Sequence, residues 1–206
     1  MTTLTAAATV RYERFLQALR PLDGLPPLLL RLYLAPVFMQ AGWNKLANFE
    51  STAAWFGNPE WGLGLPAPAL MAALASGAEL VGGLLLIVGL GTRLVAIPLA
   101  VTMLVAIFAV HWDNGWLAIS DASSWLANER VEEAAARKEM AIKLLKEHGN
   151  YGWLTARGSI TILNNGIEFA VTYLIMVLSL LATGGGRFTS LDYWLAARQP
   201  ASGETR

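Results

Sequence analysis

Long apolar stretches separated by shorter polar segments dominate the chain. Four of them are long enough, at 1.5 Å of rise per helical residue, to approach or cross a hydrocarbon core about 30 Å thick. These stretches are residues 28–46, 68–90, 94–112 and 160–183. Buried helices of a soluble protein are the alternative, but four such stretches in 206 residues favour membrane spans. We therefore predict an all-α fold, an integral membrane four-helix bundle.

The polar segments define the rest of the predicted organisation. Residues 1–27 lack the apolar centre of a signal peptide and are predicted to form a cytoplasmic amphipathic helix that ends near Pro26 and Pro27. Residues 113–158 form an outer insertion in the four-span domain 28–183, and residues 184–206 a cytoplasmic tail.

The distribution of basic residues predicts the orientation of the spans. Arg11, Arg14 and Arg20 precede the first span, whereas residues 47–67 contain no Lys or Arg. The positive-inside rule then places both ends of the chain in the cytoplasm. The insertion 113–158 conflicts with this orientation, because it would place six basic residues on the outer side. Seven acidic residues in the same insertion offset their charge.

The insertion itself contains a predicted helix at residues 124–148. Asp121 or Ser123 could cap its first turn, Gly149 would end it, and Glu133 and Arg137 are spaced to form an ion pair. This helix could lie on the outer leaflet, cover the mouth of the bundle, or dock a protein partner or a second copy of the chain. A solvated connector is the simplest alternative.

Composition supports a membrane protein and excludes several functions. Hydrophobic residues make up 55% of the chain and charged residues only 15%, against about 25% charged in soluble domains. The net charge is zero, so no basic surplus favours nucleic-acid binding. The sequence has no cysteine, which excludes thiolate catalysis and iron–sulfur clusters. Any redox chemistry would need bound groups or a partner.

Ionisable side chains at membrane depth are the candidates for chemistry, because each is costly unless paired or hydrated. Glu79 lies near the middle of the second span, and Glu168 lies about 12 Å below the outer end of the predicted fourth span. Lys45 and His111 lie at the outer ends of the first and third spans. We predict one polar pocket open to the outer face.

Two kinds of role are predicted for the candidate residues, of which Arg31 lies at the inner end of its span and the others toward the outer side. Glu79, Glu168 and His111 are predicted to transfer protons. The predicted substrate- or cofactor-binding residues are Lys45, Asn44, Asn164, Asn165 and Arg31.

Simpler explanations exist for most of these residues. Lys45 could extend to the interface, His111 could be an interfacial ring, and the two glutamates could form structural pairs. Arg31 could anchor the cytoplasmic end of its span. No metal-ligand spacing is present, so no metal site is predicted.

Small residues predict which helix is central. Ala78 and Gly82 in the second span form a small-xxx-small pair, and the first span offers Ala41 and Gly42. Close helix contact at these positions would place Glu79 beside the tightest approach.

Five fragments follow one another in a recognisable order. They are Arg31, Gly42-Trp43-Asn44-Lys45-Leu46, Gly64-Leu65-Pro66, Glu79-Leu80-Val81-Gly82-Gly83 and Gly89-Leu90-Gly91-Thr92-Arg93. Together they resemble the DoxX family of small bacterial membrane proteins. The resemblance covers about residues 31–111. It implies a multi-pass protein of the bacterial inner membrane, with Arg31, Lys45, Glu79 and Arg93 at the polar positions of the family.

The resemblance also implies a link to redox chemistry. Related proteins resemble the membrane subunit of thiosulfate:quinone oxidoreductases, and others are tied to oxidative or thiol stress. The long insertion departs from this pattern and is similar to proteobacterial members that accompany copper-linked, ribosomally made peptides. We therefore do not carry the thiosulfate activity over to this chain.

Three functions remain open. The first is a redox-associated subunit that binds a quinone or a partner's redox group in the predicted pocket. The second is a small transporter that uses Glu79 and Glu168 to bind a proton or cation. The third is a non-enzymatic assembly or docking factor, with a link to copper or metal stress, that acts through residues 124–148.

Overall fold

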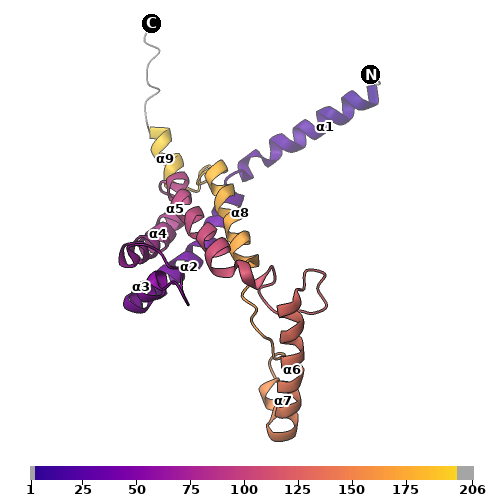
Figure 1. Cartoon of the computed structure of the whole chain (residues 1–206). Helices are drawn as coiled ribbons and strands as arrows, with labels where there is room; N and C mark the ends of the chain where they lie inside the picture. The colour runs from indigo at the N-terminus through magenta and orange to yellow at the C-terminus, as the bar shows by residue number, and fades with distance from the viewer. Residues whose placement is uncertain (1–2, 199–206) are drawn as a thin grey trace. The chain divides into compact units, whose positions relative to one another are not determined.

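A computed structural model describes residues 3–198, and it describes burial from residue 9 onward. Apart from loops, these residues are helical, with one isolated antiparallel bridge between Ile119 and Leu163. The helices (Figure 1) are α1 (Thr3–Leu19), η1 (Arg20–Leu22), α2 (Leu25–Ala47), α3 (Phe49–Gly57), α4 (Pro68–Val88), α5 (Thr92–Val105), η2 (Ala106–His111), η3 (Trp112–Asn114), α6 (Glu129–His148), α7 (Tyr151–Leu154), α8 (Glu168–Thr183) and α9 (Leu191–Arg198). The predicted all-α class is confirmed.

The chain divides into two compact units. The first unit comprises Met1–Ala100 and Ile175–Arg206, and the second comprises Val101–Leu174. The end of the predicted tail, from residue 199, lies outside the described residues.

Three helical segments of the described chain are long and apolar enough to cross a membrane. They are Thr9–Ala47, Pro68–Val88 and Thr92–Asn114, with mean hydropathy of 1.3, 2.0 and 2.4. They correspond to the first three predicted spans, of which the second ends at Val88 instead of residue 90 and the third continues through His111 and Trp112 as predicted. The cytoplasmic location of the two ends stays a prediction.

The fourth predicted span is shorter than expected. Helix α8 begins at Glu168 rather than at residue 160, and its 16 residues extend about 24 Å. The residues before it are extended instead: Ser120 N–H donates to the Ile162 carbonyl at 2.9 Å, and Asn164 N–H donates to the Ala118 carbonyl at 2.9 Å. This pairing takes up backbone groups that an earlier helix start would have used. Four spans are therefore not established.

Close approach of α2 and α4 builds the core of the first unit. A Cβ atom at Gly42 would lie 2.6 Å from the backbone nitrogen of Leu80, and one at Gly83 would lie 2.9 Å from the Ala35 carbonyl oxygen. Gly82, the neighbour of Gly83, instead faces Leu99 of α5. Helix α4 thus contacts a neighbour on each of two faces, and its place at the centre of a four-helix bundle stays a prediction.

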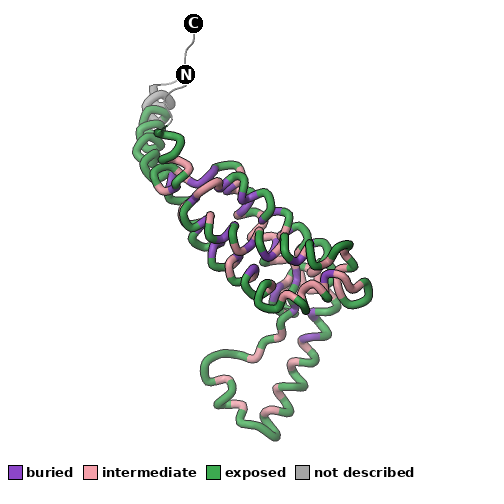
Figure 2. Tube along the Cα trace, turned by 90° about the vertical axis from the view of Figure 1, so that its left-hand side faces the viewer, coloured by how far each residue is buried: buried purple, intermediate pink, exposed green. Residues whose placement is uncertain are grey.

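The other faces of these helices are apolar and exposed. In Figure 2 buried positions alternate with exposed ones along the helical tube. The exposed positions of α4 include Leu70, Leu74, Val81 and Leu84. Large apolar side chains exposed along a helix of this length are expected where lipid, and not water, surrounds it.

The first and third helical segments each contain a local departure from a regular α-helix. Pro26 and Pro27 lie in the first turn of α2, where proline fits because the first backbone N–H groups have no helical partner. They therefore start α2 rather than only ending the preceding segment. At the other end of α5 the chain widens into one π-helical segment, η2, which ends at His111.

Helix α6 begins five residues later than predicted. Asn128, not Asp121 or Ser123, is its cap, and the Asn128 side chain accepts from the Val131 N–H at 3.1 Å. The Asp121 carboxylate instead accepts from the hydroxyl and the backbone N–H of Ser123, which lowers the pKa of Asp121. The end at Gly149 is confirmed.

Candidate functional site

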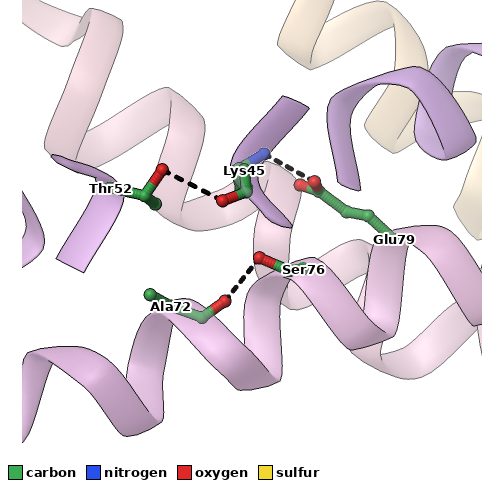
Figure 3. Close-up of polar contacts among 5 residues, drawn as sticks. All are labelled: Lys45, Thr52, Ala72, Ser76 and Glu79. Atoms are coloured by element: carbon green, nitrogen blue, oxygen red, sulfur yellow. Dashed lines mark hydrogen bonds and ion pairs between the residues drawn. The ribbon is translucent and has the colours of Figure 1, made fainter. Parts of the chain in front are cut away.

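An ion pair joins α2 to the middle of α4. The Lys45 ammonium lies 2.5 Å from the Glu79 carboxylate, and Figure 3 shows the two side chains pointing toward one another. The Glu79 side chain is only 4% exposed, whereas that of Lys45 is 28% exposed. One member of the pair is therefore in the helix packing, and the other reaches its edge.

The neighbouring residues explain how α2 and α4 bring these groups together. Gly42 lies one turn before Lys45, and a Cβ atom there would be 3.1 Å from the Cβ of Glu79 and 2.8 Å from the Ser76 carbonyl oxygen. The Ser76 hydroxyl donates to the Ala72 carbonyl at 2.7 Å within α4, and the Thr52 hydroxyl donates to the Lys45 carbonyl at 3.3 Å (Figure 3). Glycine at position 42 thus allows the approach that pairs Lys45 with Glu79.

A buried ion pair is costly to assemble and costly to break. Removing two charges from water costs several kcal/mol for each ion, and the attraction between them offsets that cost only with good geometry. Because Glu79 lies too deep to reach water by itself, Lys45 is its compensating charge. The arrangement places a carboxylate beside an ammonium donor between two apolar helices.

Arg31 lies on the same helix but in a different place. It precedes Lys45 by 14 positions, or about 21 Å of helix, and it is 0% exposed. Its guanidinium donates to the carbonyls of Leu86 at 3.1 Å, Ile87 at 3.3 Å and Thr189 at 2.8 Å. These contacts join α2 to the end of α4 and to the segment before α9. Its donors thus hold backbone carbonyls away from Lys45, and a binding role for Arg31 stays a prediction.

Asn164 organises a separate polar cluster in the second unit. Its side-chain amide is buried and donates to the carbonyls of Asn114 at 2.8 Å and Leu117 at 2.7 Å. Its oxygen accepts from the Arg130 guanidinium at 3.2 Å. Asn164 thus holds the loop after η3 and the start of α6 to the extended segment before α8.

Glu168 and His111 belong to the same unit as Asn164. The Glu168 carboxylate accepts from the Ala118 N–H at 2.9 Å, and Glu168 is the first residue of α8. The predicted position of Glu168, about 12 Å below the start of its helix, is wrong, because residues 160–167 are not helical and α8 begins at Glu168. His111 Nδ1 donates to the Asn165 carbonyl at 2.9 Å, so the Nε2 of the neutral ring is left as a proton acceptor.

The structure therefore brings the predicted residues into two groups. Lys45 and Glu79 meet in the first unit, and His111, Asn164, Asn165 and Glu168 surround one loop in the second. A single pocket that contains both groups stays a prediction. Asn44 is exposed, and its carbonyl accepts from the Asn48 side chain at 2.9 Å.

Several residues with central contacts were missed from the sequence. Asn114 and Arg130 complete the cluster around Asn164, and Asn114 also donates to the Asn165 carbonyl at 2.9 Å. Asp192 accepts from the backbone N–H groups of Gly91 at 2.6 Å and Thr92 at 2.9 Å, at the start of α5. The Asn114-Gly115 dipeptide is a turn signal from which the role of Asn114 could have been predicted. No local sequence pattern indicates the role of Asp192.

Metal binding finds no support in the described part of the chain. No group of three or more His, Asp or Glu side chains within residues 3–198 is arranged to hold a metal ion.

Comparison with known proteins identifies the part of the chain that holds the ion pair. Residues 27–112 match the DoxX family. This segment is similar to the DoxX domain. The match contains α2 to α5 and includes Arg31, Lys45, Glu79 and Arg93, so the resemblance found from the sequence is confirmed. No solved structure matches the chain.

One curated relative is similar to part of the chain. The protein of Bacillus subtilis (strain 168) described as "Putative oxidoreductase CatD" is 37% identical over 83 residues. The aligned region is 40% of this chain and 58% of that protein. The chain thus spans less than two thirds of the length of the curated relative it matches.

Proposed function

We propose that this DoxX-domain protein is a redox-associated subunit of the bacterial inner membrane that binds a quinone, or a partner's redox group, at Lys45 and Glu79. The observation that carries the proposal is the ion pair between the half-buried Lys45 ammonium and the buried Glu79 carboxylate. Its donor and acceptor suit a ring with polar oxygens inside an apolar bundle.

The chemistry of the pair supports this ligand class. An ammonium can donate a hydrogen bond to a ring oxygen and stabilise negative charge that develops there, and a carboxylate can accept or deliver a proton. Reduction of a quinone to a quinol takes up two electrons and two protons. The sequence has no cysteine, so we propose that a partner supplies the electrons while Glu79 moves a proton and Lys45 orients the ring. The word "oxidoreductase" in the relative's description agrees with this assignment.

His111 is proposed as a further proton-transfer group. The hydrogen bond from Nδ1 to the Asn165 carbonyl leaves Nε2 as the acceptor. Glu168 is a weaker candidate, because one of its carboxylate oxygens is used by the Ala118 N–H.

Binding of a short-chain quinone tests the proposal. Trp43 lies two residues before Lys45 and is exposed, so quenching of tryptophan fluorescence in detergent can follow the titration. Glu79→Gln and Lys45→Met are expected to weaken binding by about tenfold or more, which corresponds to about 1.4 kcal/mol. The matched controls, Glu133→Gln and Arg137→Met, alter the exposed Glu133–Arg137 pair and are expected to bind as the unmodified protein does. Equal binding by all five proteins would refute the assignment.

A transporter is the second candidate, and the unequal exposure of the ion pair favours it. A carboxylate that is 4% exposed, joined to an ammonium that is 28% exposed, could pass a proton or cation between the bundle and its edge. Proton flux into liposomes that is abolished by Glu79→Gln and kept by Glu133→Gln would support transport. Flux that Glu79→Gln leaves unchanged would contradict it.

Docking of a partner or a second copy through α6 is a third, separate proposal. Met140 and Leu144 are exposed and lie one turn apart on this helix. Deletion of residues 124–148 is expected to release a bound partner or dissociate an oligomer. Retention of either would contradict this role.

A further inference from the structure

The C-terminal segment forms a cavity with the turn between α4 and α5. The cavity has a volume of about 560 Å³. Its lining residues are Gly91, Arg93, Leu94, Thr183, Gly184, Gly185, Gly186, Arg187, Ser190, Asp192 and Tyr193. All of them belong to the first unit. None of them takes part in the ion pair between Lys45 and Glu79, which belongs to the packing of α2 against α4.

Two arginines supply the positive charge of this cavity. The Arg93 guanidinium donates to the Ala182 carbonyl at 3.0 Å, and the Arg187 guanidinium lies 4.8 Å from the centre of the Phe188 ring. Each contact holds the side chain while leaving several of its five N–H donors for another partner. The acidic residue in the lining, Asp192, is hydrogen-bonded to the two backbone N–H groups at the start of α5.

Glycines keep the space beside the arginines open. Gly184 and Gly186 have φ values of +78° and +95°, in the region that favours glycine. A Cβ atom at Gly184 would lie 3.3 Å from the Arg93 guanidinium, and one at Gly185 would lie 2.7 Å from the Thr92 hydroxyl oxygen. That hydroxyl is buried and has no hydrogen-bond partner among the residues that the structure describes. A polar group without a partner therefore lies directly behind the cavity wall.

The position of the cavity indicates which class of anion it would bind. It lies at the beginning of α5 and the end of α8, two apolar helices. The ends of membrane helices lie at the level of the lipid head groups. Leu94 lines the cavity and is 74% exposed, and Ile97, one turn along α5, is also exposed. These side chains offer an apolar path that continues from the arginines into the bilayer.

We propose that this cavity binds the phosphate group of an anionic phospholipid. Arg93 and Arg187 contact the phosphate oxygens, because a planar guanidinium pairs with phosphate through two parallel hydrogen bonds. The acyl chains lie along Leu94 and Ile97. The bound lipid joins the C-terminal segment to the α4–α5 turn at the membrane surface.

Native mass spectrometry of the full chain in detergent tests this site. The probes are dioleoylphosphatidylglycerol and dioleoylphosphatidylcholine, which share acyl chains and differ in net charge. The unmodified protein is expected to bind the anionic lipid about tenfold more tightly. Arg93→Gln with Arg187→Gln is expected to remove that preference. The control pair, Arg11→Gln with Arg14→Gln, makes the same change in net charge on the exposed N-terminal helix and is expected to keep it.

Three outcomes would overturn the proposal. The first is equal affinity of the unmodified protein for the two lipids, a measurement that needs no variant to fold. The second is a preference that the cavity variant keeps or that the control loses equally, since binding would then follow net charge alone. The third is displacement of the anionic lipid by millimolar inorganic phosphate, which would assign the cavity to the free anion instead of a lipid. An anionic preference that resists phosphate and disappears in the cavity variant alone supports the site.

Discussion

Replacing Lys45 by methionine would leave the Glu79 carboxylate inside the helix packing without its cation. Loss of one partner from a fully buried ion pair costs about 3 to 5 kcal/mol. Lys45 is 28% exposed, so water already reaches its ammonium and the pair is partly screened. We therefore expect Lys45→Met to lower the free energy of unfolding by about 3 kcal/mol, the lower end of that range.

The reverse substitution is expected to cost less. In Glu79→Gln the remaining ammonium can turn to water, so we expect a loss of about 1 kcal/mol, the net value of one hydrogen bond. The double variant Lys45→Met/Glu79→Gln contains neither charge and should be no less stable than Lys45→Met alone. The double-mutant cycle should then give a coupling of about 1 kcal/mol or more between the two residues.

Unfolding in mixed micelles, followed by tryptophan fluorescence, provides the measurement. The exposed Glu133–Arg137 pair of the same chain is the matched control, and we expect Arg137→Met to change stability by less than about 0.5 kcal/mol. If Lys45→Met changes the stability as little as Arg137→Met does, and the cycle shows no coupling, water screens the ion pair. Our account of a buried carboxylate would then be wrong.

Three further predictions concern other parts of the structure. Asn164→Ala removes both donors and the acceptor of a buried amide and should destabilise the second unit by about 2 kcal/mol; hydrogen exchange of its loop amides as slow as in the unmodified protein would contradict this. Gly42→Val should lower the yield of folded protein, because its side chain would overlap the α4 backbone, whereas Gly77→Ala, with nothing within 4 Å of the added atom, should not; equal yields would be the contrary result. Asp192→Ala removes the cap of α5 and should lower stability by about 1 kcal/mol; an unchanged unfolding midpoint would argue against that capping role.

The sequence was sufficient to predict the features that depend on local pattern. Continuous apolar stretches predicted the first three spans, because crossing a bilayer requires about 20 apolar residues in one helix. Small residues predicted the close approach of the first and second spans, and a Cβ atom added at Gly42 would lie 3.1 Å from the Cβ of Glu79. The sequence marked Lys45 and Glu79 as rare charges of the spans, but their pairing required the structure.

Features that depend on distant pairing could not be predicted in this way. The apolar character of residues 160–167 is typical of a membrane helix. Residues 115–120 instead take their backbone hydrogen bonds, so α8 begins only at Glu168. The burial of Asn164 follows from the same pairing. Asp192 reaches the start of α5 only because the segment after α8 folds back on the α4–α5 turn, and no local pattern shows this.

Quinone content of the protein purified gently from its native membrane tests the central claim most directly. Extraction with organic solvent and ultraviolet difference spectra before and after chemical reduction would give the number of quinone molecules per chain. We predict about one quinone per chain in the unmodified protein and in Glu133→Gln, with most of it lost in Glu79→Gln. Absence of quinone from the unmodified protein, or equal amounts in all three proteins, would contradict a quinone site at Lys45 and Glu79.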